Sequence, residues 1–93
     1  MTAVVIGIDP HKRSNTALVL DAHENVLAKQ RFANDQDGYR ELKHFAQPWR
    51  ERTWAVEGAR GVDLGLAQRI AGDGERVLNG LFLLAVGQGV TRR

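Results

Sequence analysis

The chain has 93 residues, enough for one small domain with a single hydrophobic core. Hydrophobic residues make up 43% and charged residues 26% of the sequence, an ordinary globular balance that argues against intrinsic disorder. Because there is no cysteine, disulfides and cysteine metal sites are excluded. Thirteen Lys and Arg residues against eleven acids leave a net charge of +2, too small to indicate a nucleic-acid-binding protein by itself.

No segment of the sequence is expected to enter a membrane. The longest apolar stretch, 81–86, is far shorter than the roughly 20 residues that a transmembrane helix needs. The N-terminus lacks the basic segment and cleavage site of a signal peptide. We therefore expect a cytoplasmic protein with no membrane partner.

The first third of the chain is predicted to be an antiparallel meander of three strands. An almost continuous apolar run, 3–9, is typical of a central strand covered on both faces. Polar turns separate it from a second apolar run, 16–20, and from a third strand, 26–32. The short connections favour antiparallel pairing. Lys29, Gln30 and Arg31 indicate that the third strand lies at a sheet edge, where charged side chains discourage further pairing.

A helix is expected after the meander, because apolar residues then recur every three or four positions. Asn34 or Asp35 can cap its N-terminus, and Pro48 disfavours its continuation. The apolar positions of this helix are Tyr39, Leu42, Phe45 or Ala46, and Trp49. Their spacing predicts a helix that packs one face on the core.

The remaining chain alternates between strand and helix patterns. A fourth strand, 53–57, precedes a second helix that ends near Gly72 or Gly74, both suitable C-caps, and a fifth strand begins at Glu75. The predicted fold class is α/β, a mixed five-stranded sheet in the order β-β-β-α-β-α-β with helices packed on it. Strands one and four are expected to be parallel neighbours, as are strands four and five.

Two of these strands end in a carboxylate followed by a chain-breaking residue: Asp9 before Pro10, and Glu57 before Gly58. Parallel neighbours would place both carboxylates at the same rim of the sheet. Adjacent carboxylates are stable when they share a proton or bind a cation. Asp9 and Glu57 are therefore the predicted ligands of Mg²⁺ or Mn²⁺ and the predicted catalytic pair for chemistry on phosphate. The structural alternatives are a turn at Asp9 and a helix cap at Glu57.

Basic residues lie near both carboxylates in the sequence. His11, Lys12 and Arg13 follow Asp9 directly, and Arg50, Arg52 and Arg60 flank the fourth strand. They are either solvated cations or contacts to a phosphate backbone. Lys12, Arg13 and Arg60 are the candidate nucleic-acid-binding residues, and His11 is a weaker candidate for a metal ligand or proton carrier.

The ordered motifs resemble those of a known family. The segments 6–12 (IGIDPHK), 17–21 (ALVLD) and 55–61 (AVEGARG) resemble the N-terminal domain of the DEDD transposases, which are bacterial insertion-sequence recombinases. The resemblance implies a ribonuclease H-like, Holliday-junction-resolvase-like fold, metal-dependent cleavage and exchange of DNA strands, and guidance by a structured bridge RNA. Of the four acids that hold metal in this family, the first falls on Asp9 and the acid of the fourth strand on Glu57.

The resemblance ends near Asn79. The family's two later acids belong to a Lys-Thr-Asp-like motif and its nucleophilic serine to a C-terminal domain, and no segment of this sequence matches either. We expect a partial domain over 1–79 and an atypical tail over 80–93, as a truncated or frameshifted gene would produce. We also expect no DNA cleavage by this chain alone, and self-association through the sheet edge or the apolar tail.

Two other functions stay open at this point. One is a non-catalytic DNA- or RNA-binding or assembly module that uses the basic rim and the tail. The other is a fragment of an actin-like or sugar-kinase ATPase, because Gly7-Ile8-Asp9 also resembles the first phosphate loop of those enzymes. Salt-dependent binding that survives Asp9→Asn would favour the binding module, and nucleotide binding would favour the ATPase.

Overall fold

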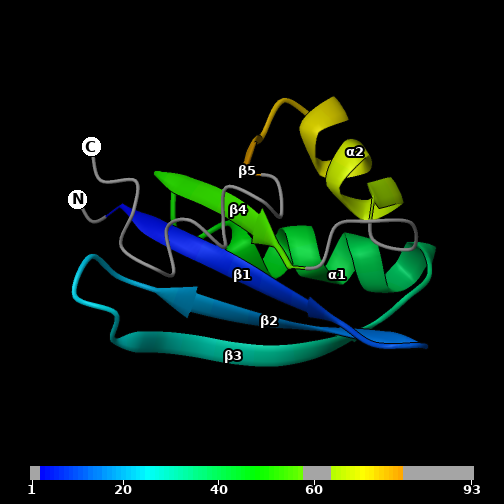
Figure 1. Ribbon diagram of the computed structural model, residues 1–93, viewed down its shortest axis with the longest axis horizontal. Helices are drawn as coiled ribbons and strands as arrows, with labels where there is room; N and C mark the ends of the chain where they lie inside the picture. Colours follow the sequence, from blue (N-terminus) through cyan, green and yellow to red (C-terminus); the bar gives the residue numbers. More distant parts are fainter. Residues whose placement is uncertain (1–2, 58–63, 79–93) are drawn as a thin grey trace.

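The computed structural model describes residues 3–57 and 64–78, with the side chain of Leu64 left out. The predicted tail, 80–93, therefore lies outside the described residues. In chain order the elements are β1 (Val4–Pro10), β2 (Ser14–Leu20), β3 (Val26–Ala33), α1 (Gln36–Ala46), β4 (Arg52–Val56), α2 (Leu64–Gly72) and β5 (Arg76–Leu78) (Figure 1). This order confirms the one predicted from the sequence. Neither described helix is long and apolar enough to cross a membrane.

The five strands form one mixed sheet in the order β3-β2-β1-β4-β5 (Figure 1). β1 pairs antiparallel with β2, and β2 with β3, as expected for short turns. β4 is parallel to both of its neighbours, β1 and β5. The predicted α/β class and mixed sheet are confirmed, and the arrangement is compatible with a ribonuclease H-like fold.

One hydrophobic core lies between a face of the sheet and the two helices. Alternate residues of β1 are at most 3% exposed, because every second side chain of a strand points to the same face. Leu42 of α1 and Ile70 of α2 pack into this core beside Trp54 of β4. The predicted apolar stripe of α1 is confirmed for four residues: Leu42 and Ala46 are buried, while Tyr39 and Phe45 are partly buried against the core. Trp49 is also partly buried there, but it follows the end of α1 and is not part of the helix.

The opposite face of the sheet is less enclosed than the sequence predicts. Both helices contribute to the same core, so neither covers that face. Val5 and Gly7, the residues of β1 that alternate with its core residues, are half-buried rather than buried. β1 is therefore a central strand with one fully buried face. Val5 and Gly7 lie on its other face, which also carries Asp9.

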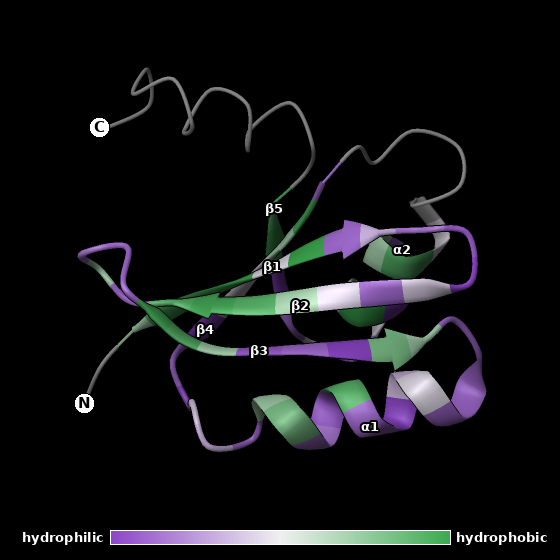
Figure 2. Cartoon of the chain, turned by 90° about the horizontal axis from the view of Figure 1, so that it is seen from below, coloured by the Kyte–Doolittle hydropathy of each residue, from purple (hydrophilic) through white to green (hydrophobic). Residues whose placement is uncertain are grey.

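The start of α1 and the end of α2 are each defined by a specific residue. The Asp35 side chain accepts a hydrogen bond of 2.7 Å from the Gly38 amide and caps α1, which resolves the choice between Asn34 and Asp35. α1 runs alongside β3, and its apolar and polar residues alternate around the helix (Figure 2). At the end of α2, Gly74 has a φ of 88°, a left-handed conformation suited to glycine. Gly74, rather than Gly72, therefore turns the chain into β5.

α1 approaches the end of β3 closely at one position. A Cβ added to Gly38 would lie 1.8 Å from the carbonyl oxygen of Ala33. No side chain fits there, because the opposing atom belongs to the backbone of the strand and cannot rotate away. Gly38 therefore allows the first turn of α1 to lie directly against β3.

Candidate functional site

Asp9 and Glu57 lie at the carboxyl ends of adjacent parallel strands. Ile8 of β1 is the register partner of Val56 of β4, so the next residues on the two strands are neighbours. The Glu57 amide continues this pairing, because it donates a hydrogen bond of 3.0 Å to the carbonyl of Ile8. Ile8 and Val56 are both buried in the core, so alternation places the two carboxylates on the opposite face. The geometry expected for the pair, one rim of the sheet on neighbouring strands, is present.

The surroundings of Asp9 are mainly solvent. Its side chain is 61% exposed, and Glu57 is also exposed. The Nε2 atom of His11 lies 3.6 Å from a carboxylate oxygen of Asp9, an ion pair only when the imidazole is protonated. Within residues 3–57 and 64–78, no three His, Asp or Glu side chains lie close enough together to hold one metal ion. Two hard oxygen donors with open solvent around them suit Mg²⁺, which keeps several of its waters when it binds to proteins.

The structure describes two of the three predicted nucleic-acid contacts. Lys12 and Arg13 are exposed in the turn between β1 and β2, at the same end of the sheet as Asp9. Arg60 lies outside the described residues. Arg52, one of the cations that flank the fourth strand, begins β4, whereas Glu57 follows the end of that strand. Arg52 therefore lies at the opposite end of the sheet, where it is 18% exposed and paired within the protein.

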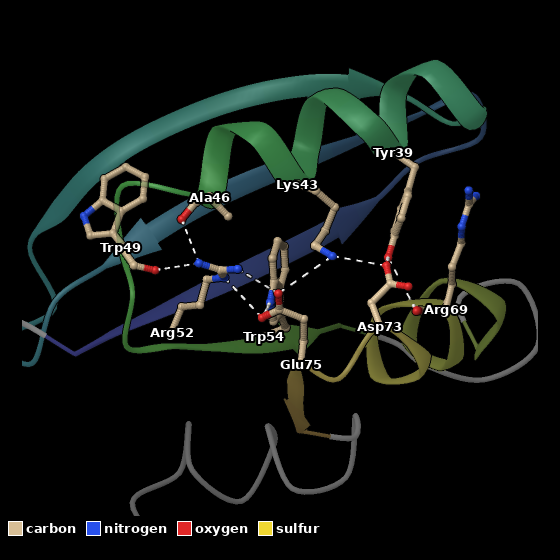
Figure 3. A network of polar contacts seen from close by, with 9 residues as sticks. All are labelled: Tyr39, Lys43, Ala46, Trp49, Arg52, Trp54, Arg69, Asp73 and Glu75. Carbon is tan, nitrogen blue, oxygen red and sulfur yellow. Dashed lines mark hydrogen bonds and ion pairs between the residues drawn. The ribbon is translucent and has the colours of Figure 1, made fainter.

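That opposite end holds a polar cluster that the sequence did not indicate (Figure 3). Arg52 donates to both carboxylate oxygens of Glu75, from Nε at 3.1 Å and from Nη2 at 2.7 Å. Its Nη1 donates to the carbonyls of Ala46 and Trp49 at 3.3 and 2.8 Å. The indole of Trp54 donates to Glu75 at 2.9 Å. One guanidinium thus joins the C-terminus of α1 to the starts of β4 and β5.

The cluster continues between the two helices (Figure 3). The Tyr39 hydroxyl of α1 donates to the Asp73 carboxylate just after α2, and Lys43 Nζ lies 3.1 Å from that carboxylate. Lys43 is also 3.7 Å from Glu75, which connects the two halves of the cluster. The Arg69 guanidinium lies over the Tyr39 ring, 3.9 Å from its centre.

These contacts shift the pKa values of three groups. Burial, together with the Asp73 carboxylate, raises the pKa of Tyr39. Hydrogen bonds from Tyr39 and Lys43 hold the pKa of Asp73 below its ordinary value. Burial alone would raise the pKa of Glu75, but the hydrogen bonds from Arg52 and Trp54 outweigh it and lower that pKa. All three shifts favour the charge states that hold the cluster together, so we assign it a structural role.

A cavity of about 240 Å³ lies at the same end of the sheet as Asp9, but on the helix side. His11, Phe32, Tyr39 and Arg69 are among its lining residues. Its buried polar residue, Asn15, donates a hydrogen bond of 3.4 Å to the Asn34 side chain. Because Asn15 has a partner within the protein, the cavity presents no buried polar group that requires a ligand.

Most of the chain matches one known protein family. A family model described as Transposase, that of the IS110-type DEDD transposases, matches residues 6–78. The search of curated proteins found no match. The family match covers every strand and helix except the first two residues of β1, and it includes both Asp9 and Glu57. Since it spans most of the sequence, the chain belongs to the DEDD transposase family of the IS110 type.

Proposed function

We propose that Asp9 and Glu57 are the part of a transposase metal site that this chain contributes, and that the site serves cleavage and exchange of DNA strands. The observation that carries the proposal is the register of β1 and β4, which makes the two carboxylates neighbours at one rim. A divalent ion held there would stabilise negative charge on a phosphate oxygen. The family match favours this function over an ATPase fragment.

The strength of the site follows from its electrostatics. Neighbouring strands are about 4.8 Å apart. Two carboxylates at about 5 Å repel each other by between about 1 and 3 kcal/mol, for effective dielectric constants between those of water and of a protein surface. The 61% exposure of Asp9 favours the lower value. The repulsion that a bound cation would relieve is therefore small, and we expect the pair to bind Mg²⁺ weakly.

A complete site for phosphoryl transfer requires more ligands. Two-metal sites hold their ions about 3.5 to 4 Å apart with several bridging groups. The described part of the chain brings two carboxylates together, with no third acid beside them. The sequence has no match to the family's later acid motif. We therefore propose that this chain alone binds one ion and does not cleave DNA.

Metal binding tests the proposal. The signal of free Mn²⁺ in electron paramagnetic resonance should fall when the chain is added, because bound Mn²⁺ is broadened. Asp9→Asn and Glu57→Gln should each abolish most of this binding, since each removes one of two charged ligands. Glu41→Gln removes an exposed carboxylate from α1 and is the matched control. Equal Mn²⁺ binding by all three variants would refute the proposed site.

A cleavage assay tests the second part. Incubation of the chain with linear or branched DNA and Mg²⁺ should leave the DNA intact. Robust cutting that Asp9→Asn abolishes would show that two carboxylates suffice, and would refute the one-ion account.

Self-association and a guide RNA belong to the same proposal. Self-association is proposed through the edge of β5, the last strand of the sheet that the structure describes. Val26 and Leu27 on the other edge strand, β3, are 58% and 44% exposed and add apolar surface. Light scattering that reports a monomer at every concentration would contradict it. Binding of a structured RNA and a cytoplasmic location are proposed from the family alone.

A further inference from the structure

The register arranges side chains in rows on the face of the sheet opposite the helices. The row at the rim contains, strand by strand from β3 to β4, Arg31, Thr16, Asp9 and Glu57. The next row contains Lys29, Leu18, Gly7 and Ala55. The edge strand β3 therefore presents two cations on the same face, and toward the same end of the sheet, as the two carboxylates.

Both cations are available to an external partner. Lys29 and Arg31 are exposed, and neither forms an ion pair or a side-chain hydrogen bond with any residue that the structure describes. By contrast, Arg40 and Lys43 on α1 each pair with an acid of the chain. The strand is hydrophilic over this part (Figure 2).

Protection of a sheet edge from unwanted pairing does not explain this arrangement fully. A protective charge can point to either side of an edge strand. Here Gln30, the residue between the two cations, is directed to the other face and is neutral. The charge of β3 is thus confined to the face that carries Asp9, which points to a partner of negative charge on that face.

The spacing fits a nucleic-acid backbone. β3 lies two strands from β1, about 10 Å across the sheet, and Lys29 is about 7 Å from Arg31 along the strand. One strand of duplex DNA carries a phosphate for about every 3.4 Å of helix axis. A strand with one phosphate at the carboxylate rim therefore reaches β3 within about three nucleotides. On β2, Thr16 and Leu18 lie between the two cations and β1.

We propose that Lys29 and Arg31 are phosphate contacts for duplex DNA that lies across β3, β2 and β1 toward Asp9 and Glu57. That the DNA extends toward Asp9 and Glu57 rests on the proposed function. The phosphate contacts of Lys29 and Arg31 do not require a bound metal ion. Carboxylates repel a phosphate backbone until a cation is bound. The two β3 cations attract the backbone nearby and so hold it beside the site.

The test uses single-charge variants of the full chain in a buffer without divalent metal. Arg31→Gln and Lys29→Gln each remove one charge from the proposed contact. Arg40→Gln removes a charge that is also exposed but lies on α1, in the helix layer, and is the matched control. Fluorescence anisotropy with a short labelled DNA duplex gives the binding constant at several salt concentrations.

Each β3 variant should reduce the slope of log K against log salt by about 0.9, and the double variant by about 1.8, because each phosphate contact releases counterions. Arg40→Gln should leave the slope unchanged. The proposal is overturned if the slopes of the β3 variants equal that of the unchanged chain, if Arg40→Gln lowers the slope as much, or if the unchanged chain shows no salt-dependent binding. The same slope changes with RNA but not with duplex DNA would overturn the assignment to DNA.

Failure of this contact is distinguishable from failure of the metal site. Asp9→Asn should bind the duplex at least as tightly as the unchanged chain in metal-free buffer, because it removes a repulsive charge. If Mn²⁺ binding fails while the β3 slopes change as expected, the metal proposal alone is refuted. Thermal melting of each variant checks folding, and exposed substitutions of this kind should change stability by no more than about 0.5 kcal/mol.

Discussion

Replacement of Glu75 by glutamine tests whether the polar cluster holds the helices on the sheet. The Glu75 side chain is 14% exposed and accepts three hydrogen bonds, two from Arg52 and one from Trp54. Glutamine has the same shape but keeps only one acceptor oxygen. Its amide nitrogen is a donor that would face the donors of Arg52 or Trp54, so at least one hydrogen bond must break.

The expected loss of stability follows from these contacts. A hydrogen bond to a charged group contributes about 1.5 to 3 kcal/mol, and breaking a fully buried ion pair costs about 3 to 5 kcal/mol. In Glu75→Gln, Arg52 is 18% exposed and keeps its hydrogen bonds to two carbonyls, so the loss should be smaller than that for a fully buried ion pair. We expect Glu75→Gln to lower the free energy of unfolding by about 2 to 4 kcal/mol, which corresponds to a fall in Tm of at least about 8 °C.

Urea unfolding followed by tryptophan fluorescence measures this loss. Trp54 is fully buried and contacts Glu75, so its emission reports the region directly. Glu41→Gln makes the same chemical change at an exposed position of α1 and should alter stability by less than about 0.5 kcal/mol. A loss for Glu75→Gln no larger than that of the control would refute the structural role of the cluster.

The remaining predictions use the same unfolding assay. Because the folded pKa of Glu75 lies below its ordinary value of 4.5, its ionised form stabilises the fold fully above pH 4.5, and this contribution is lost as the pH falls through the folded pKa. The difference in the free energy of unfolding between the unchanged chain and Glu75→Gln should therefore shrink below pH 4.5. A constant difference below that pH would contradict the assignment. Gly38→Ala should cost about 3 kcal/mol or more, because its Cβ would lie 1.8 Å from the Ala33 carbonyl, whereas Gly65→Ala in α2 meets nothing within 4 Å and should gain about 0.5 kcal/mol. Asp35→Ala should cost about 1 kcal/mol by removing the cap of α1; a loss below that of Glu41→Gln would show that the cap is dispensable.

The order of the elements and the position of Asp9 and Glu57 could be predicted from local features. Short turns enforce antiparallel pairing of β1, β2 and β3, and a helix between strands brings the next strand back parallel. Once β1 and β4 are parallel neighbours, residues that follow their last buried positions must meet at one rim. The prediction needed only strand ends and strand direction, both of which the sequence shows.

Contacts between distant segments could not be predicted in this way. The side chains that hydrogen-bond to one another in the polar cluster are 21 to 34 residues apart in the sequence, and no periodicity connects them. Arg52 and Glu57 are near each other in the sequence, but Arg52 is the first residue of β4 and Glu57 directly follows its last, so the extended strand separates them by about 17 Å. Sequence distance along a strand is thus a poor guide to which end of a sheet a residue occupies.

The face shared by Lys29 and Arg31 with Asp9 also depends on tertiary structure. From the sequence, these cations indicate only an edge strand. Their relation to the carboxylates requires the registers of two strand pairs, Thr16 with Arg31 and Asp9 with Thr16. A slip of one residue in either pair would direct the cations to the helix side.

The most direct test of the metal site is the position of bound Mn²⁺ in the amide NMR spectrum of the chain. Paramagnetic broadening falls steeply with distance, so sub-stoichiometric Mn²⁺ should first broaden the amides of Ile8, Asp9, Val56 and Glu57. The double variant Asp9→Asn, Glu57→Gln should lose this broadening. Broadening centred on Asp21, the residue that follows β2, or on Asp73, or broadening unchanged in the double variant, would contradict a metal site at the ends of β1 and β4.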